Sequence, residues 1–499
     1  MKKPLLIGID AGTSSVKICI FNINGELVRQ GEVKIAFSSP RPGWIELDLK
    51  QYWDATCRVL REITTDLTGF AGLGFSVTSP TTVFLDDEGL PVRPAIPYLD
   101  IRSKEDVEEL VKYWGGEEDF QSHVGNKPIP STYSAGIVRW IMREENNSWN
   151  RTKKVGFLNT FLCGQLTGEW AVDPTVASFS GLVRLAEPFK WSDELRELSG
   201  IPSSKLLTIL TPYTKIGEVT PQAAKETGLP TGLPVALGCA DTAAASFALG
   251  LSQKGDCFES AGTSDVLTFC LDRPDFNSMF LNRSHVYPGR WLAHGAMSTP
   301  GAAIEWLITN VFPELGTVSE LEKEAERSEP GARGLIFLPY LAGERSPIFD
   351  PNAKGLWLGL RLDTRRADII RAVYEGIAFG LRQILKYAEA QWDLKIKSLP
   401  CVGGAAKSQL GLKIKADVLG LEYQTTDFQH VAALGAALLG GIAGGVYMGW
   451  EDPEIPYLKK FNSCFKPNFT NYKIYDQLFT IYERLYPSTK EAMHALNVY

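Results

Sequence analysis

Two stretches of the sequence repeat one pattern: residues 5–22 read LLIGIDAGTSSVKICIFN, and residues 255–270 read GDCFESAGTSDVLTFC. Each contains a strand-like run, the tetrapeptide Ala-Gly-Thr-Ser and a second strand-like run. The tetrapeptides begin at Ala11 and Ala261, about half a chain length apart in a protein of 499 residues. A glycine-containing turn between two strands is typical of a β-hairpin. The repeat therefore predicts two related domains, each opening with a hairpin.

The length of the chain also indicates two domains, because 499 residues exceed the size at which a single hydrophobic core stops growing. We expect the boundary just before the second hairpin, giving domains 1–248 and 249–499. Strand signals at 72–76 and 234–239 are interleaved with helical periodicity at 51–65 and 134–144. This alternation of strands and helices predicts an α/β fold.

The second half of the chain contains a long predicted helix over residues 365–392, for which Asp363-Thr364 is the expected N-cap. Its apolar face is expected to consist of Ile370, Val373, Ile377, Leu381 and Leu385.

Composition excludes several classes of protein. With 44% hydrophobic and 22% charged residues, the chain is neither disordered nor fibrous. A net charge of −7 argues against a basic surface that binds nucleic acid. The eight cysteines form no CxxC pair and fit reduced, buried thiols in a cytosolic protein, and the five histidines lack metal-ligand spacing.

One uncharged stretch, residues 431–450, is long enough to be tested as a membrane span. It contains six glycines and five alanines, so it is weakly apolar and suits close packing of backbones. We predict a buried helix of a soluble protein rather than a span. Asp10 also interrupts the N-terminal apolar run before a signal-peptide core could form, so a cytoplasmic protein without a membrane partner is expected.

The two glycine turns suit the binding of phosphate. In Gly12-Thr13-Ser14, backbone amides and hydroxyls can donate to phosphate oxygens, and Asp10 at the strand end could hold a hydrated Mg²⁺. A plain hairpin turn with a solvated Asp10 is the alternative. The same tetrapeptide recurs at residues 262–264, so two turns could grip a polyphosphate from both sides of a cleft.

Asp241 follows an apolar strand and precedes a helix rich in small residues. Two compatible roles are open for it. It could be the helix N-cap, which aspartate favours. It could also be a general base at the carboxyl end of a strand, where α/β proteins place ligands. The Gly403-Gly404 turn before another predicted helix could admit a nucleoside closely, or could be purely structural.

Together these motifs resemble the FGGY family of carbohydrate kinases, which share the actin/Hsp70/hexokinase-like ATPase fold. The stretch at 5–22 is similar to the first phosphate motif of that family, and ESAGTSDVL to the second. Further similar segments, in chain order, are PGWIELD (42–48), PAIPYLDIR (94–102), GCADTAAAS (238–246), GERSPIFDPNAKGLWLGL (343–360), RADIIRAVYEGIAFGLRQIL (366–385), GGAAKSQLGLKIKADVLG (403–420) and HVAALGAALLGGIAGG (430–445).

The resemblance implies two duplicated actin-like (ribonuclease H-like) domains with ATP and Mg²⁺ in the cleft between them. It implies Asp241 as the general base for γ-phosphoryl transfer and as a metal neighbour together with Asp10. The nucleotide-binding residues that it implies are Thr13, Ser14, Lys17, Gly262, Thr263, Ser264, Gly301, Gly404 and Ser408. The N-terminal domain would bind the sugar and the C-terminal domain the nucleotide.

The acceptor segment departs from the better-known members of the family. Thr78-Ser79-Pro80 stands where glycerol kinases carry Gln-Arg-Glu and xylulokinases Gln-Met-His, so glycerol is disfavoured and a standard xylulose pocket is in doubt. The candidate acceptor contacts are Ser79, Tyr98, Asp100 and Arg102, besides Asp241. Ser79 could instead make surface contacts, and Asp100 with Arg102 could form a structural ion pair.

The sequence thus predicts an ATP-dependent kinase for a small-molecule acceptor, a neutral ketose or polyol such as a pentulose. Other acceptors of the family, such as an erythritol-type polyol or gluconate, remain open. So do a partner-coupled actin- or Hsp70-like ATPase, a non-catalytic sugar sensor, and a homodimer.

Overall fold

The first hairpin forms the centre of a sheet in the computed structural model, which describes residues 4–276, 279–426, 428–458 and 461–498. β1 (Leu5–Ala11) pairs antiparallel with β2 (Ser15–Asn22) and parallel with β4 (Phe70–Val77). The strand order is β3-β2-β1-β4-β9-β8, and β10 also pairs with β4. The other bounds are β3 (Leu27–Lys34), β8 (Lys215–Glu218), β9 (Pro234–Ala236) and β10 (Cys239–Ala240).

The second hairpin occupies the same place in a second sheet, of order β13-β14-β12-β11-β17-β18-β19. In both sheets two antiparallel pairings are followed by two parallel ones, so β14-β12-β11-β17-β18 repeats β3-β2-β1-β4-β9. The duplicated α/β fold is therefore confirmed. The bounds are β11 (Cys257–Ala261), β12 (Asp265–Leu271), β13 (Leu281–Ser284), β14 (Trp291–Met297), β17 (Ser398–Val402), β18 (Glu422–Thr425) and β19 (Ser463–Phe465).

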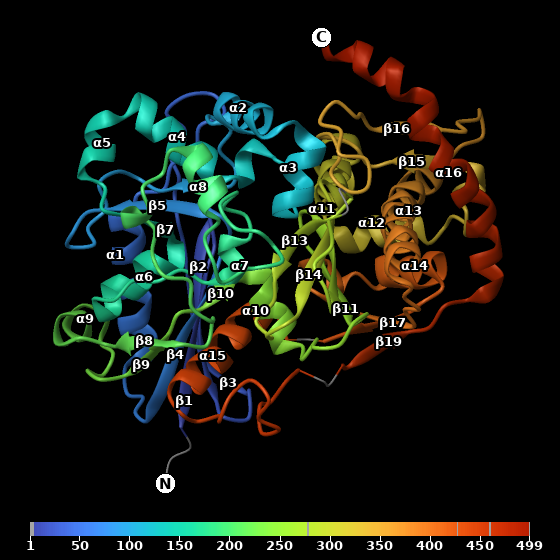
Figure 1. Ribbon diagram of the computed structural model, residues 1–499. Coiled ribbons are helices and arrows are strands. Elements are labelled where there is room, and N and C mark those ends of the chain that lie inside the picture. The colour runs from blue at the N-terminus through green and yellow to red at the C-terminus, as the bar shows by residue number, and fades with distance from the viewer. Residues whose placement is uncertain (1–3, 277–278, 427, 459–460, 499) are drawn as a thin grey trace.

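Helices cover the two sheets, and each sheet with its helices forms one lobe (Figure 1). The predicted helices correspond to α1 (Leu49–Thr64), α4 (Ser134–Glu144) and α13 (Arg366–Trp392), whose expected apolar face is buried. The expected N-cap of α13 was wrong. Arg365 is the N-cap, and its N–H donates to the Asp368 side chain at 2.9 Å, while the Asp363 carboxylate pairs with Arg333 and Arg361.

The remaining helices are α2 (Lys104–Trp114), α3 (Glu117–Val124), α5 (Asn146–Arg151), α6 (Leu158–Thr167), α7 (Pro174–Ala177), α8 (Asp193–Ser199), α9 (Pro221–Thr227), α10 (Asp241–Ala248), α11 (Pro300–Trp306), α12 (Val318–Ala325), α14 (Gln409–Leu419), α15 (Val431–Ala443) and α16 (Phe469–Ala495). Two small sheets complete the fold: β6-β5-β7, from β5 (Thr81–Leu85), β6 (Ile96–Pro97) and β7 (Lys154–Phe157), and β15-β16, from β15 (Ile336–Leu338) and β16 (Leu356–Leu358).

Residues 431–443 of the uncharged stretch form α15, and residues 444–450 form turns and bends. This helix comes from the second half of the sequence but packs in the first lobe against β1, β4 and α10 (Figure 1). A Cβ at Gly8 would lie 1.8 Å from the carbonyl oxygen of Ala433, and one at Gly435 would lie 2.0 Å from that of Ala244. Only glycine permits this approach. The predicted buried helix is confirmed over residues 431–443. In the described part of the chain no helix is long and apolar enough to cross a membrane.

Candidate active site

A cavity of about 410 Å³, called here the cleft cavity, is lined by residues of both lobes. The first lobe contributes six of the residues predicted from the sequence, and the second lobe contributes part of β11 and the start of the turn after β17. The predicted residues in its wall are Asp10, Thr13, Ser14, Lys17, Tyr98 and Asp241. The structure thus brings together, around one cavity, the first turn, Asp10 and Asp241, the last of which is both a proposed metal neighbour and the proposed base.

The parallel strands explain why the two carboxylates meet. Asp10 lies at the end of β1 beside Ser76 of β4, and Cys239 of β10 pairs with the same Ser76. Asp241 follows β10 directly, so one strand separates the two aspartates at a shared sheet edge. Of the two roles left open for Asp241, the structure excludes the N-cap, because Ala240 is the N-cap and Asp241 is the first residue of α10.

Burial shifts the titration of both carboxyls. It raises the pKa of Asp10 to about 6, against an opposing hydrogen bond from Ser76 Oγ at 2.8 Å. Burial also raises the pKa of Asp241, and the positive charge of Arg283 on β13 partly offsets this shift. The negative charge of Asp241 contributes to the raised pKa of Asp10, so the two carboxylates repel each other. A cation between them would relieve this repulsion.

A buried network fixes the backbone that carries Asp241. The N–H of Ala240 donates to Thr175 Oγ1 at 2.8 Å. Thr175 in turn donates to the Asp173 carboxylate, which caps α7 and also accepts from Asn159 Nδ2 at 2.8 Å. These side chains are fully buried, so the start of α10 is rigidly placed.

The first turn is held tightly enough to present its amides and hydroxyls. The Gly12 N–H donates to the Ser15 carbonyl at 2.9 Å, and the Tyr52 hydroxyl donates to the Gly12 carbonyl at 2.9 Å. Thr13 Oγ1 lies 3.1 Å from Thr78 Oγ1, which also lines the cleft cavity.

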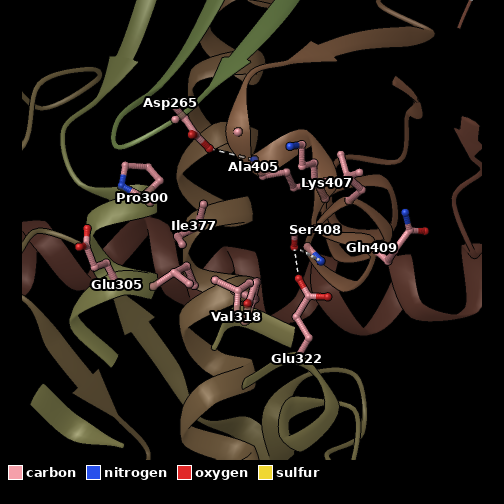
Figure 2. A pocket seen from close by; sticks show the side chains of 18 of the residues that line it. Asp265, Pro300, Glu305, Val318, Glu322, Ile377, Ala405, Lys407, Ser408 and Gln409 are labelled. Atoms are coloured by element: carbon pink, nitrogen blue, oxygen red, sulfur yellow. Dashed lines mark hydrogen bonds and ion pairs between the residues drawn. The ribbon is translucent and has the colours of Figure 1, made fainter. Parts of the chain in front are cut away.

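A larger cavity of about 800 Å³, called here the large cavity, lies in the second lobe (Figure 2). Of the predicted nucleotide residues, Gly262, Thr263, Gly301, Gly404 and Ser408 line it. Ser264 belongs to the same turn as Gly262 but is not among the lining residues. The two cavities adjoin, because Gly403 lines the cleft cavity and Gly404 the large one.

Side chains at one end of the large cavity are suited to polar recognition. Ser408 is the N-cap of α14, and its hydroxyl donates to the neighbouring carboxylate of Glu322 on α12 (Figure 2). The Tyr374 hydroxyl is buried without a hydrogen-bond partner among the described residues. An apolar wall with a few such groups is typical of a small-molecule site.

Of the residues predicted to contact the acceptor, some line the cleft cavity and others do not. Tyr98 lines the cleft cavity near Asp241, whose charge contributes to the raised pKa of the Tyr98 phenol after burial. Ser79 is not among the described lining residues of either cavity, and its Oγ is buried without a hydrogen-bond partner among them.

Asp100 and Arg102 form the ion pair that the sequence left open. Arg102 Nη2 lies 2.8 Å from Asp100 Oδ2, and both side chains are fully buried. Asp100 also accepts from the Ile45 N–H at 2.6 Å, and Arg102 Nη1 reaches Glu46 at 2.9 Å. In this geometry the two side chains neutralise each other and line neither cavity.

Several lining residues were not predicted. Gln429 and His430 precede α15 and line the cleft cavity, while Asp265, Glu322, Tyr374 and Lys415 line the large one. Two of them had a local signal: Lys415 interrupts the apolar face of a predicted helix, and Asp265 directly follows the predicted turn 262–264. The others carry no local signal, since only packing brings α12, α13 and the start of α15 to the cavities.

No cluster of three or more histidine, cysteine, aspartate or glutamate side chains within the described ranges could hold a metal ion. Asp10 and Asp241 nevertheless offer two carboxylates to one cavity. Mg²⁺ is commonly held by one or two carboxylates, with water and substrate phosphates as the other ligands. The residues present therefore fit Mg²⁺ that arrives with a nucleotide.

Comparison with known proteins agrees with this geometry. Residues 5–248 match the N-terminal domain of the FGGY family of carbohydrate kinases, and residues 258–444 match its C-terminal domain. A xylulose kinase of Staphylococcus xylosus is 27% identical over 96% of this chain and 99% of its own. A gluconokinase of Bacillus subtilis is 25% identical over 88% of each. The crystal structure of a xylulose kinase from Rhodospirillum rubrum has a TM-score of 0.88 at 29% identity, covering 98% of this chain and 100% of that one.

Proposed function

The chain belongs to the FGGY family of carbohydrate kinases and is an ATP-dependent carbohydrate kinase, and we propose that Asp241 is the general base that prepares its acceptor. The observation that carries this proposal is the cleft cavity, where Asp241 shares one space with the first turn and Asp10. The proposed acceptor is a neutral ketose or polyol of four to six carbons, such as a pentulose.

The division of the site follows from the adjoining cavities. The nucleoside end of ATP would occupy the large cavity, between Gly301 on one wall and Gly404 with Ser408 on another. The polyphosphate would then pass the second turn and reach the cleft cavity, where Thr13, Ser14 and Lys17 stand. Amides and hydroxyls of the two turns would donate to phosphate oxygens, whose charge grows where donors are already oriented.

The acceptor hydroxyl would lie beside Asp241. The carboxylate accepts the proton of that hydroxyl as its oxygen attacks the γ-phosphorus, and ADP leaves on the opposite side. Mg²⁺ bound near Asp10 and Asp241 would neutralise phosphate charge. The buried network through Thr175 keeps the carboxylate in place for this transfer.

The identity of the acceptor follows less directly. Thr78 and Tyr98 give the cleft cavity an uncharged, hydroxyl-bearing wall, which supports a neutral polyhydroxy acceptor. Contact by Ser79, Asp100 or Arg102 stays a prediction from the sequence. Relatives include both xylulose kinases and a gluconokinase, so a gluconate-type acceptor is the second candidate. The cytoplasmic location, the homodimer and the domain boundary at 248 also stay predictions.

The test is acceptor-dependent ADP release by purified protein with Mg-ATP, across ketoses, polyols, aldonates and glycerol. We expect strong stimulation by one neutral sugar or polyol. In Asp241→Asn the turnover should fall by about 100-fold or more, with ATP binding retained. The control is Asp87→Asn, at an exposed aspartate away from both cavities, which should leave turnover unchanged.

Three results would contradict the proposal. Unchanged turnover of Asp241→Asn would remove Asp241 from the mechanism. ADP release that no acceptor stimulates would indicate an ATPase coupled to a partner, and the absence of any release would indicate a sensor.

A further inference from the structure

Three charged side chains are buried together beside the second turn. They are Glu259 on β11, Asp265 on β12 and Lys415 on α14, and their exposed fractions are 0%, 1% and 7%. Lys415 Nζ lies 2.9 Å from Asp265 Oδ2 and also forms an ion pair with Glu259. We call these three residues the lysine triad.

The triad stands at the base of the second turn. Ala261 pairs with Asp265 in the β11–β12 ladder, and the turn 262–264 lies between them, so Glu259 and Asp265 belong to the two strands that enter and leave the turn. Lys415 therefore joins both strands to a helix. Asp265, which Figure 2 labels, lines the large cavity, and so do Lys415, Gly262 and Thr263.

The same helix carries other parts of the large cavity. α14 begins after Ser408, and Gln409, Gly411 and Leu412 of its first turns line the cavity with Lys415. A tie between α14 and the second hairpin thus sets the distance between two walls of the large cavity.

Stability alone is a weak reason for such a cluster. Replacing a buried ion pair by apolar side chains of similar volume is often neutral or stabilising. Two carboxylate oxygens of the triad, Glu259 Oε2 and Asp265 Oδ1, are also buried without hydrogen-bond partners in the described part of the chain, which adds an unfavourable desolvation. What the triad does provide is a fixed geometry at the base of a turn.

We propose that Lys415 is a positioning residue for the nucleotide, which holds the second turn at the separation from α14 that the ATP polyphosphate requires. This inference rests on the proposed function in one respect, since the ligand of the turn is taken to be ATP. It assigns Lys415 no contact with the acceptor and no part in proton transfer.

The first experiment compares Lys415→Met with Lys413→Met in the full chain. Lys413 is on the same helix but is exposed, so it is the matched control. We measure the Kd for ATP by titration calorimetry without acceptor, and KM for ATP, KM for the acceptor and kcat. Loss of a charge-assisted hydrogen bond to a phosphate oxygen weakens binding by about 10- to 100-fold. We therefore expect that loss in Kd and KM for ATP, with KM for the acceptor within about twofold, and no change in Lys413→Met.

A second variant separates positioning from folding, because Lys415→Met alone leaves two buried carboxylates without a counter-charge. In the triple variant Glu259→Gln, Asp265→Asn, Lys415→Met the cluster is uncharged and the fold is expected to be retained, but α14 is still untied from the hairpin. The proposal expects weak ATP binding to persist in it. Recovery of wild-type ATP affinity in the triple variant would overturn the proposal.

Failure of this inference can be told from failure of the proposed function. Wild-type protein that binds ATP but phosphorylates no acceptor would contradict the proposed function alone. Wild-type ATP affinity in both Lys415 variants, together with normal acceptor-dependent turnover, would contradict the positioning role alone.

Discussion

Replacing Gly301 by alanine should weaken ATP binding without changing any charged or polar group. Gly301 is the second residue of α11 and faces the second turn. A Cβ at this position would lie 2.1 Å from the carbonyl oxygen of Gly262 and 3.1 Å from Cα of Thr263. Because these are backbone atoms, no side chain can move aside to make room.

The size of the effect follows from the overlap. Ordinary contact begins near 3.4 Å, so the turn and the start of α11 must separate by about 1 Å. A displacement of this size at a site that orients a reacting group can reduce the rate by about 100-fold, or about 2.7 kcal/mol. We expect kcat/KM for ATP to fall towards this limit, mainly through a higher KM for ATP, and KM for the acceptor to change little.

The assay is acceptor-dependent ADP release with varied ATP, together with the midpoint of thermal unfolding of the apo protein. The control for apo stability is Gly404→Ala, in the same cavity, where no heavy atom lies within 4 Å of the added Cβ. Apo stability should fall in Gly301→Ala and stay unchanged in Gly404→Ala. A Gly301→Ala protein with wild-type KM for ATP would refute the assignment of the second turn to phosphate binding.

Three further predictions concern stability and the acceptor. Burial raises the pKa of Glu344 to about 7, so the folded protein holds the proton of this carboxyl more tightly than the unfolded chain does. The stability that the bound proton contributes is fully present below the unfolded pKa of 4.5 and is lost as the pH rises through about 7. Between pH 4.5 and 8, denaturant unfolding should show the wild type losing about 3 kcal/mol more stability than Glu344→Gln; parallel pH curves would contradict this. Gly435→Ala, which would stabilise an ordinary helix, should destabilise α15 by about 1–3 kcal/mol, because the new Cβ would meet the carbonyl oxygen of Ala244; a raised unfolding midpoint would show that the packing is looser. Tyr98→Phe should raise KM for the acceptor several-fold, with KM for ATP unchanged. A variant in which both KM values equal those of the wild type would remove Tyr98 from the acceptor site.

Much of the fold was predictable from the sequence because its signals are local. A glycine turn between two strand-like runs indicates a hairpin, and two copies of AGTS half a chain apart indicate duplication. The same locality placed Asp10 at a strand end and Asp241 at the start of a helix after a strand. Since carboxyl ends of parallel strands share a sheet edge, their meeting in the cleft cavity follows from the topology.

The N-cap of α13 shows where local reasoning stopped. Asp363-Thr364 was a sound candidate by residue type, yet the Asp363 side chain bonds with Arg333, which lies 30 residues earlier in the chain, and Arg365 takes the cap position. The sequence also left the role of Asp100 and Arg102 open, because their spacing permits both a pocket wall and an ion pair. Their burial against Ile45 and Glu46 decides for the ion pair in this structure.

The sequence by itself therefore determined the duplicated α/β architecture, the two turns and the position of Asp241, since each depends on neighbours along the chain. Only the tertiary structure decided that α15 returns to the first lobe, that Lys415 ties the second hairpin to α14, and which acceptor candidates face the cleft cavity. These contacts join residues far apart in sequence. They depend on how whole elements pack, and no short stretch of the sequence encodes that packing.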